Sequence, residues 1–148
     1  MTPKISLDLK PSSLYVPEKF KGKVPENLPV NLPDGFRASV FAVEGLRGPR
    51  MMAFDDQGVL HVANMKANGS DEYQPRGNSS SEILALPDYN GDGVADTVIV
   101  AAKGLRWANS LSFYKGAMYV ADTHQIVKFT DNDGDLAYES SEVFADSI

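Results

Sequence analysis

The sequence contains no cysteine, only two histidines and no long apolar run. Without cysteine the chain has no disulfide, no thiolate metal site and no cysteine nucleophile. No apolar run approaches the roughly 18 residues of a membrane-spanning helix, so we expect no membrane span. The 14 Lys and Arg residues stand against 20 Asp and Glu, and the resulting net charge of −6 is opposite to that of proteins that bind nucleic-acid phosphates. We therefore expect no nucleic-acid partner.

The 148 residues, 43% hydrophobic and 23% charged, have the length and composition of a folded domain. Residues 1–10 lack the apolar segment of a signal peptide. Six of the nine prolines lie in residues 1–35, and proline disfavours helix interiors and central strands. We therefore predict a Pro-rich extended N-terminal arm over residues 1–35, followed by the folded part over residues 36–148.

The folded part contains an internal repeat, which is the strongest indication of its architecture. Glu82–Ala101 aligns with Gln125–Ala145 at an offset of 43 to 44 residues. Gly45–Arg47 and Val62–Ala63 recur 58 to 59 residues later. The larger offset arises from a polar stretch, Met65–Ser80, which we interpret as a long insertion loop facing a partner or substrate.

Each repeat contains four short apolar segments separated by turns rich in Gly, Asp and Asn, a pattern typical of antiparallel strands. No helical apolar period exceeds about two turns, so we expect no helix. Four antiparallel strands in a repeat of this length are typical of a β-propeller blade. With Arg37–Val43 counted as the outer strand of an earlier blade, the sequence predicts an all-β fold of about two and a half four-stranded blades. The other expected strands are Met51–Phe54, Val59–Ala63, Ile83–Leu86, Thr97–Ala101, Ser110–Phe113, Ala117–Ala121, Ile126–Phe129 and Glu142–Ala145.

Two segments, PDGFRASVFAVEGLRGPRMMAFDDQGVLHVAN and LPDYNGDGVADTVIVAAKGLRWANSLSFYKGAMYVAD, resemble the opening blades of the soluble quinoprotein glucose/sorbosone dehydrogenases. The likeness covers Leu32–Ile148, and its most specific part is the G-L-x-W-x-N-S-L-x-F pattern at Gly104–Phe113. Family members usually have proline where Ala108 stands. The resemblance implies a six-bladed propeller in the periplasm or outside the cell, which oxidises a sugar C–OH with pyrroloquinoline quinone (PQQ) and calcium.

The family's catalytic histidine lies in a later His-His-Gly-Trp segment, and nothing in this chain matches it. The resemblance therefore implies that the catalytic base is not in this chain. Successive connections of an antiparallel meander alternate between its two ends, so the blade-to-blade links and the links between second and third strands share one face. The resemblance implies that cofactor and substrate bind on that face. The candidate residues there are Arg50, Asn64, Arg106, Trp107, Asn109 and His124.

Most of these candidates also have a purely structural interpretation, and both interpretations stay open at this point. Trp107 either packs between blades or stacks on a planar quinone or sugar. Asn109 either ties a turn together or lines the central pocket. Arg50 and Arg106 are either surface cations or ligands for the carboxylates of PQQ, which suit a bidentate guanidinium.

The two histidines have different expected roles. His124 lies in a turn and is either a base acting near neutral pH or a solvated loop residue, and the sequence assigns it no Asp or Ser partner. His61 alternates with Leu60 and Val62 along an expected strand. We therefore predict a structural position for His61, in the interior or at a sheet edge.

One acidic loop has the spacing of a calcium site. Asp88, Asn90, Asp92 and Asp96 place oxygen side chains at positions 1, 3, 5 and 9, and Gly93 at position 6 permits a sharp turn. Alternating positions of a tight loop converge, and Ca²⁺ takes six to eight oxygen ligands. The loop is not an EF-hand, because position 12 is not Glu and strands flank it.

The second copy of this loop keeps the spacing but has Leu136 where the first has glycine. We predict a structural calcium ion in either loop, with the alternative that both are ordinary hairpin turns. The second set of candidate ligands is Asp131, Asp133, Asp135 and Glu139.

Two functions follow. The chain is either part of a PQQ-dependent sugar or aldose dehydrogenase, or a non-catalytic, calcium-stabilised propeller segment that serves interaction or assembly. Because a blade buries its faces against neighbours, the expected partners are other blades, from identical copies, a partner chain or missing sequence. Without them, apolar side chains are expected to be exposed: Met51, Met52, Leu111, Phe113, Met118 and Val120.

Overall fold

The computed structural model describes residues 8–25, 27–66 and 80–148. Most of the predicted insertion loop, residues 67–79, lies outside the described residues. The chain divides into two compact units: Met1–Val43 with Gly91–Val94, and Glu44–Asn90 with Ala95–Ile148. Each unit is treated separately below.

The proline-rich segment of the first unit folds back on itself. Strand β1 (Lys10–Ser13) pairs antiparallel with β2 (Pro29–Leu32), and a single 3-10 turn, η1 (Glu18–Phe20), lies between them in the chain. Both strands are edge strands of a two-stranded sheet, where proline costs little because half of the backbone donors have no strand partner. Within the segment predicted as a Pro-rich extended arm, the structure thus has a small antiparallel pair of strands.

The strand predicted over Arg37–Val43 does not form. This segment makes one isolated parallel bridge, in which Tyr15 N donates to Ala38 O at 2.9 Å and Val40 N donates to Tyr15 O at 3.0 Å. The next bond of a parallel ladder would need the backbone N–H of residue 17, and residue 17 is Pro, which has none. The outer strand predicted over Arg37–Val43 is therefore replaced in the structure by a single bridge.

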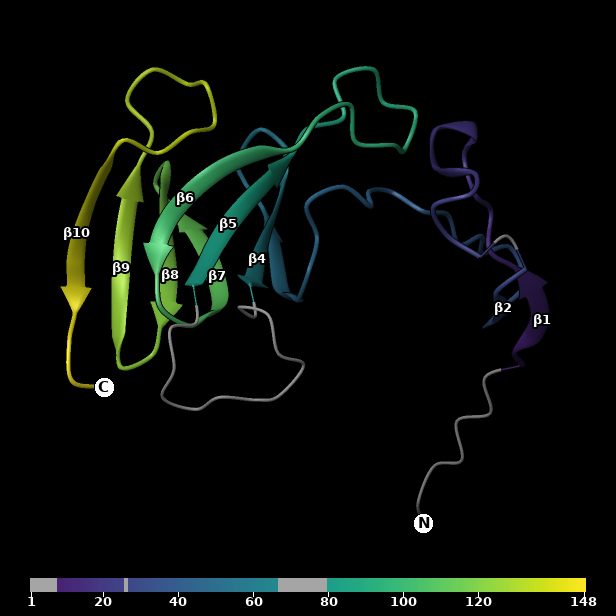
Figure 1. Cartoon of the computed structure of the whole chain (residues 1–148), viewed down its shortest axis with the longest axis horizontal. Coiled ribbons are helices and arrows are strands. Elements are labelled where there is room, and N and C mark those ends of the chain that lie inside the picture. The colour runs from purple at the N-terminus through teal and green to yellow at the C-terminus, as the bar shows by residue number, and fades with distance from the viewer. Residues whose placement is uncertain (1–7, 26, 67–79) are drawn as a thin grey trace, which may run out of the picture. The chain divides into compact units, whose positions relative to one another are not determined.

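The second unit begins with a four-stranded antiparallel sheet in which sequence neighbours are also spatial neighbours (Figure 1). Its register pairs Leu60 with Phe54 on one side and with Leu86 on the other. The strands are β3 (Pro49–Phe54), β4 (Leu60–Lys66), β5 (Ser80–Leu86) and β6 (Ile99–Leu105).

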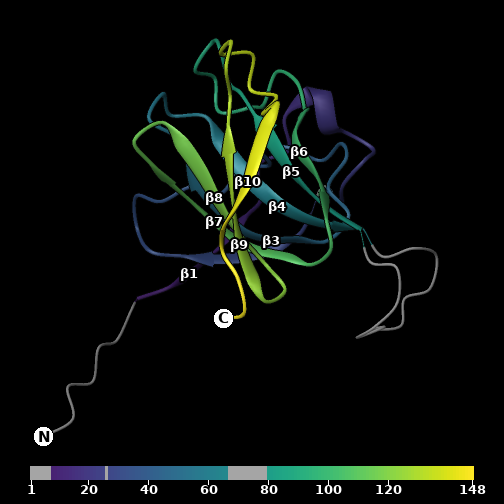
Figure 2. The same ribbon diagram turned by 90° about the vertical axis from the view of Figure 1, so that its left-hand side faces the viewer.

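The second sheet of this unit repeats the same meander, and in Figure 2 its edge strand β10 is nearest the viewer. Turns of two residues join its first three strands, which gives them a close antiparallel register. The strands are β7 (Ala108–Tyr114), β8 (Ala117–Asp122), β9 (Gln125–Thr130) and β10 (Ser140–Ala145).

The expected all-β class is confirmed: the described residues form three open antiparallel sheets of two, four and four strands and no α-helix. Each of the eight strands expected between Met51 and Ala145 overlaps an observed one. Within the described part of the chain, no helix has the length and apolar character needed to cross a membrane.

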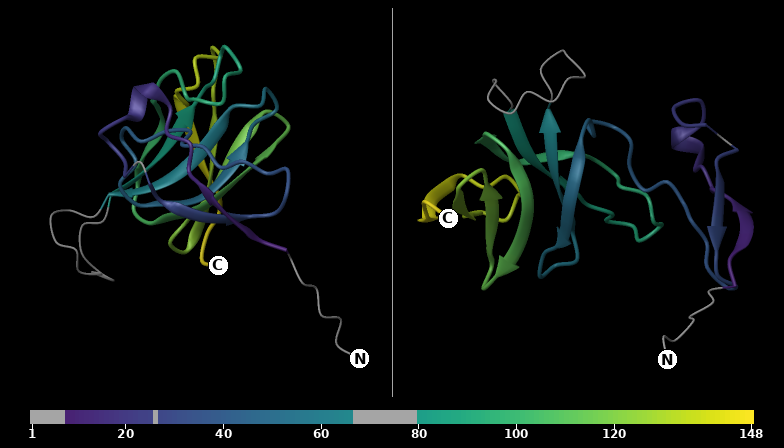
Figure 3. Two further views of the ribbon diagram at one scale, coloured as in Figure 1. Left: turned by 90° about the vertical axis from the view of Figure 1, so that its right-hand side faces the viewer. Right: turned by 90° about the horizontal axis from the view of Figure 1, so that it is seen from below.

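Buried side chains from both four-stranded sheets form the core of the second unit. Figure 3 shows the backbones of the two sheets. The first sheet contributes mainly small side chains, such as Ala63 and Ala85, and the second contributes larger ones, such as Met118 and Phe129. Large groups of one sheet thus fit against small groups of the other, as close packing requires.

This packing corrects part of the expected exposed surface. Leu111, Met118 and Val120 are buried between the two sheets, whereas Met51 and Met52 on β3 are each 59% exposed. The sequence analysis expected all of these residues to be exposed. The alternation of side chains along a strand shows which residues share a face, but not which face a second sheet covers.

Candidate functional site

Asn64 ties the turn before β3 to the end of β4. Its side-chain Oδ1 accepts hydrogen bonds from Arg47 N at 2.9 Å and Gly48 N at 3.2 Å. Its Nδ2 donates to Gly45 O at 2.9 Å and to Glu82 Oε1 at 3.2 Å. The side chain is fully buried. All its polar atoms are therefore used by the fold, which assigns Asn64 a structural role and not contact with a ligand.

Asp122 holds the corresponding turn before the second sheet through hydrogen bonds. Its carboxylate accepts hydrogen bonds from Arg106 N at 3.0 Å and Trp107 N at 2.6 Å, and the residue is 2% exposed. The offset of 58 residues that aligns Val62–Ala63 with its later copy also aligns Asn64 with Asp122. The sequence analysis did not select Asp122, although extending that alignment by one residue would have found it.

Arg50 and Asn109 are also equivalent positions in the two sheets, 59 residues apart. Each lies at the start of the first strand of its sheet, where the pairing register shifts: between Pro49 and Met52 in β3, and between Ala108 and Ser110 in β7. Both side chains are exposed. Such bulges change the direction of a side chain at a strand end, so both residues remain available to a ligand.

Arg106 and Trp107 form the link between β6 and β7. Their backbone nitrogens are bound to Asp122, and Arg106 O accepts a weak hydrogen bond from Ser81 Oγ at 3.4 Å. The Arg106 side chain is exposed and that of Trp107 is half-buried. The backbone of this link is therefore fixed, while the guanidinium group is accessible.

His124 has the acidic partner that the sequence could not assign. Its Nε2 lies 3.5 Å from Asp146 Oδ1, and its backbone O accepts a hydrogen bond from Ile148 N at 3.0 Å. Both side chains of the His–Asp pair are more than half exposed. This pair lies where the β8–β9 turn meets the segment after β10.

All six candidate residues lie at one end of the two sheets. The register pairs Pro49 with Asn64 and Ala108 with Asp122, which places the starts of β3 and β7 beside the ends of β4 and β8. The side chains of Arg50 and Arg106 are exposed at this end, and guanidinium groups in general bind carboxylates. Asn64 does not fit as a ligand residue, because its side chain is enclosed.

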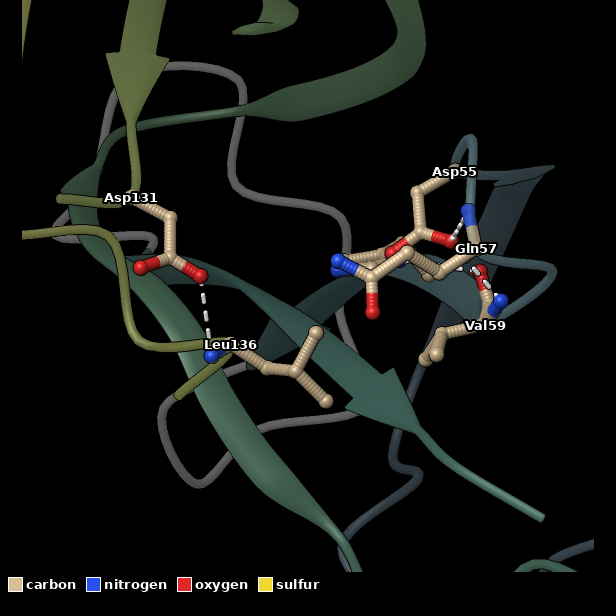
Figure 4. Close-up of polar contacts among 6 residues, drawn as sticks. Asp55, Gln57, Val59, Asp131 and Leu136 are labelled. Atoms are coloured by element: carbon tan, nitrogen blue, oxygen red, sulfur yellow. Dashed lines mark hydrogen bonds and ion pairs between the residues drawn. The ribbon is translucent and has the colours of Figure 1, made fainter. Parts of the chain in front are cut away.

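The second acidic loop brings its predicted metal ligands together. One carboxylate oxygen from each of the four residues lies within 4.8 Å of the others, and among the described residues this is the one such group of carboxylates and histidines. Several of these oxygens also accept backbone hydrogen bonds, as in the contact of 2.9 Å from Leu136 N to Asp131 (Figure 4). The four residues, Asp131, Asp133, Asp135 and Glu139, match oxygen chemistry suited to Ca²⁺.

Leu136 has the same left-handed backbone conformation in this loop that Gly93 has at the equivalent position of the first loop. Its φ of +72° is close to the +81° of Gly93 in the first loop. This left-handed conformation strains a leucine, and its side chain is buried in the core between the two sheets. Burial of the leucine offsets the strain of the turn.

The first acidic loop is divided between the two units, because Asp92 belongs to the first and its other predicted ligands to the second. Within the second unit, Asp96 accepts hydrogen bonds from Tyr89 N at 2.7 Å and Asn90 Nδ2 at 3.5 Å. Within the first, Asp92 Oδ1 accepts one from Val94 N at 2.9 Å. These are local turn contacts.

His61 is fully buried in the core of the second unit, consistent with its predicted structural position. Its Nδ1 lies 3.1 Å from Val59 O, so Nδ1 carries the proton, and its Nε2 has no hydrogen-bond partner among the described residues. The ring makes edge contacts with Phe113 and Tyr138, at centroid distances of 4.8 and 6.0 Å. Burial lowers the pKa of His61, so the ring is neutral near pH 7.

Comparison with known proteins gives one match. The profile of the family described as "Domain of unknown function (DUF7133)" matches residues 27–147, which span β2 to β10. None of the curated proteins compared with the chain matches it, and no solved structure does.

Proposed function

This chain belongs to the family described as domain of unknown function DUF7133, and we propose that it forms blades of a β-propeller similar to the quinoprotein sugar dehydrogenases. In this proposal the chain contributes part of the surface that holds PQQ for the oxidation of a sugar or aldose C–OH. The general base of that reaction lies in a part of the propeller that this sequence does not include.

The observation that carries the proposal is the repetition of one arrangement in both four-stranded sheets. In each, an amide or carboxylate at the end of the second strand binds two backbone nitrogens of the turn before the first strand, through Asn64 and Asp122. A propeller repeats a four-stranded meander in this way around an axis. The repetition supports blades of one architecture, and the G-L-x-W-x-N-S-L-x-F pattern supports the dehydrogenase likeness.

The residues assigned to cofactor binding follow from exposure. Arg50, Arg106 and Asn109 are exposed at the end of the sheets that such propellers use, and Trp107 is half-buried beside them in sequence. When bound, PQQ would accept the hydride of the substrate. The two arginines would bind its carboxylates, which suit the planar donors of a guanidinium group. The periplasmic or extracellular location and the partners that complete the ring belong to the same proposal.

Titration of the purified chain with PQQ in the presence of Ca²⁺ tests the cofactor part of the proposal. We expect a saturable change in quinone absorption, and binding should weaken about thirtyfold in the double variant Arg50→Ala, Arg106→Ala, because two lost charge-assisted contacts cost roughly 1 kcal/mol each. Lys115→Ala removes an exposed cation from the opposite end of β7 and is the control. No binding, or equal loss in the control, would contradict the proposal.

The catalytic part has a separate test. Sugar-dependent dye reduction should be absent for this chain with PQQ and Ca²⁺, because the His-His-Gly-Trp segment that supplies the base in the quinoprotein dehydrogenases has no match in this sequence. Turnover by the purified chain would contradict the assignment of the base to another part of the propeller.

A second candidate function is a calcium-stabilised segment that serves interaction or assembly without catalysis. The four convergent carboxylates of Asp131, Asp133, Asp135 and Glu139 favour it. Isothermal calorimetry with Ca²⁺ is the test: saturable binding together with failure to bind PQQ would support this function over the first. Absence of calcium heat would leave the loop as an ordinary turn.

A further inference from the structure

A pocket of about 140 Å³ lies at the other end of the two sheets, opposite the proposed PQQ face. It is bounded by the turn between β3 and β4, the turn between β7 and β8, and the loop between β9 and β10. All of its lining residues belong to the second unit. Nothing in the sequence motifs pointed to it, because its parts are far apart in the chain.

The charge of the pocket has one sign. Its ionisable acidic residues are Asp55, Asp56 and Asp131, and no Lys, Arg or His is among the residues that line it. Three lining carboxylates without a lining cation produce a negative potential in the pocket, which favours a positively charged occupant.

Two of the three carboxylates are held in place by their own turns (Figure 4). Asp55 Oδ1 accepts hydrogen bonds from Gln57 N at 2.9 Å and Val59 N at 2.8 Å. Asp131 accepts one from Gly134 N at 2.7 Å, besides the contact from Leu136 N. A site whose charges are already fixed loses little side-chain entropy when it binds a ligand.

The rest of the lining is aromatic and apolar. Phe113 and Tyr138 line the pocket, and the His61 ring makes edge contacts with both of their rings. His61 adds no positive charge beneath them, because it is neutral, and its Nε2 is a buried acceptor without a partner among the described residues. Aromatic faces attract cations.

The geometry is unsuited to a bare metal ion. Of the three pocket carboxylates only that of Asp131 belongs to a convergent group of ligands, and its partners in that group lie in the acidic loop, not at Asp55 or Asp56. The space also exceeds that of one ion and is bordered by rings as well as oxygens. We propose that this pocket binds a small organic cation, an alkylammonium group seated on Phe113 and Tyr138 between the three carboxylates.

Titration of the whole chain with tetramethylammonium chloride, followed by NMR of the backbone amides, tests the proposal, with tert-butanol as the uncharged probe of similar size. We expect saturable shifts at the amides of Gly116 and Gly134, which line the pocket, and none with tert-butanol. Equal shifts with both probes, or none with the cation, would overturn the proposal.

Asp56→Asn and Glu142→Gln form a matched pair of variants, since each neutralises one exposed carboxylate and only Asp56 lines the pocket. Asp56→Asn should weaken binding about fivefold and Phe113→Leu about threefold, while Glu142→Gln leaves it unchanged. Equal weakening by both charge variants would show diffuse attraction to the surface and overturn the site. Because Asp131 is also a proposed calcium ligand, the titrations are carried out in EDTA, and their outcome does not depend on PQQ binding.

Discussion

Asn64 and Asp122 occupy equivalent places in the two four-stranded sheets, and each binds two backbone nitrogens of a turn more than ten residues earlier in the chain. The amide also donates to Gly45 O and Glu82 Oε1, whereas the carboxylate only accepts. The same turn is thus held by two different side chains, and this difference predicts different tolerance to substitution.

Asp122→Ala should destabilise the chain by about 3 kcal/mol, because it leaves the buried donors of Arg106 and Trp107 without a partner. Asp122→Asn keeps an acceptor oxygen at the same place and should cost less than about 1 kcal/mol. Urea unfolding followed by the fluorescence of Trp107 measures both. Equal losses for the two variants would show that the hydrogen bonds to Asp122 do not hold this turn.

Asn64→Asp should be much less tolerated than Asp122→Asn. The substitution replaces a buried donor with a carboxylate facing Gly45 O and Glu82, and we expect a loss of about 2–3 kcal/mol. Adding Glu82→Gln should restore part of that stability, because its amide can donate to the new carboxylate. A double-mutant cycle without such coupling would contradict the role of the Glu82 contact.

Burial of His61 predicts a loss of stability in acid. Its pKa is lowered in the folded state, so the unfolded chain binds the proton more readily, and stability falls as pH drops through the ordinary value near 6.5 towards the folded value. His61→Phe removes this titration and keeps an aromatic ring against Phe113. The melting temperature of the variant should therefore decline less between pH 7.5 and pH 5 than that of the unsubstituted chain. An equal decline in the variant and the unsubstituted chain would contradict this prediction.

Chelation should reveal which acidic loop holds calcium. EDTA is expected to lower the melting temperature, and Asp133→Ala should remove most of that difference, because its carboxylate belongs to the convergent group. Asp92→Ala, the corresponding type of change in the first loop, should leave most of the EDTA effect in place. The reverse ranking would assign the ion to the first loop, as the glycine at position 93 suggested.

The apolar strand β3 predicts self-association or a partner. Met51, Met52 and Phe54 are each between 59% and 65% exposed on this strand at the edge of its sheet. Light scattering after size exclusion should give a mass above 16.1 kDa, and Phe54→Lys should reduce it. Tyr89→Lys, at an isolated exposed aromatic residue, is the control. A stable monomer of the unsubstituted chain would contradict this prediction and weaken the proposal of an open propeller.

The strands of the second unit could be predicted from the sequence because the turns between them are rich in Gly, Asp and Asn, and these residues favour turn conformations. The 1-3-5-9 spacing likewise located the carboxylates that converge after β9. The predicted strand before Glu44 was wrong because Pro17, far away in the chain, lacks the donor that would have extended its ladder. The pocket of Asp55 and Tyr138 was not predictable either, since its lining comes from loops that meet only when two sheets pack together.

The short turns of the second sheet imply an order of folding. Lys115 and Gly116 join β7 to β8, and Thr123 and His124 join β8 to β9. Formation of this three-stranded meander therefore closes only short loops. In the first sheet, the chain between β5 and β6 runs from residue 87 to residue 98, a longer closure. We therefore expect the meander of β7 to β9 to form first. The first sheet would then pack against its apolar side chains, which include Met118 and Phe129.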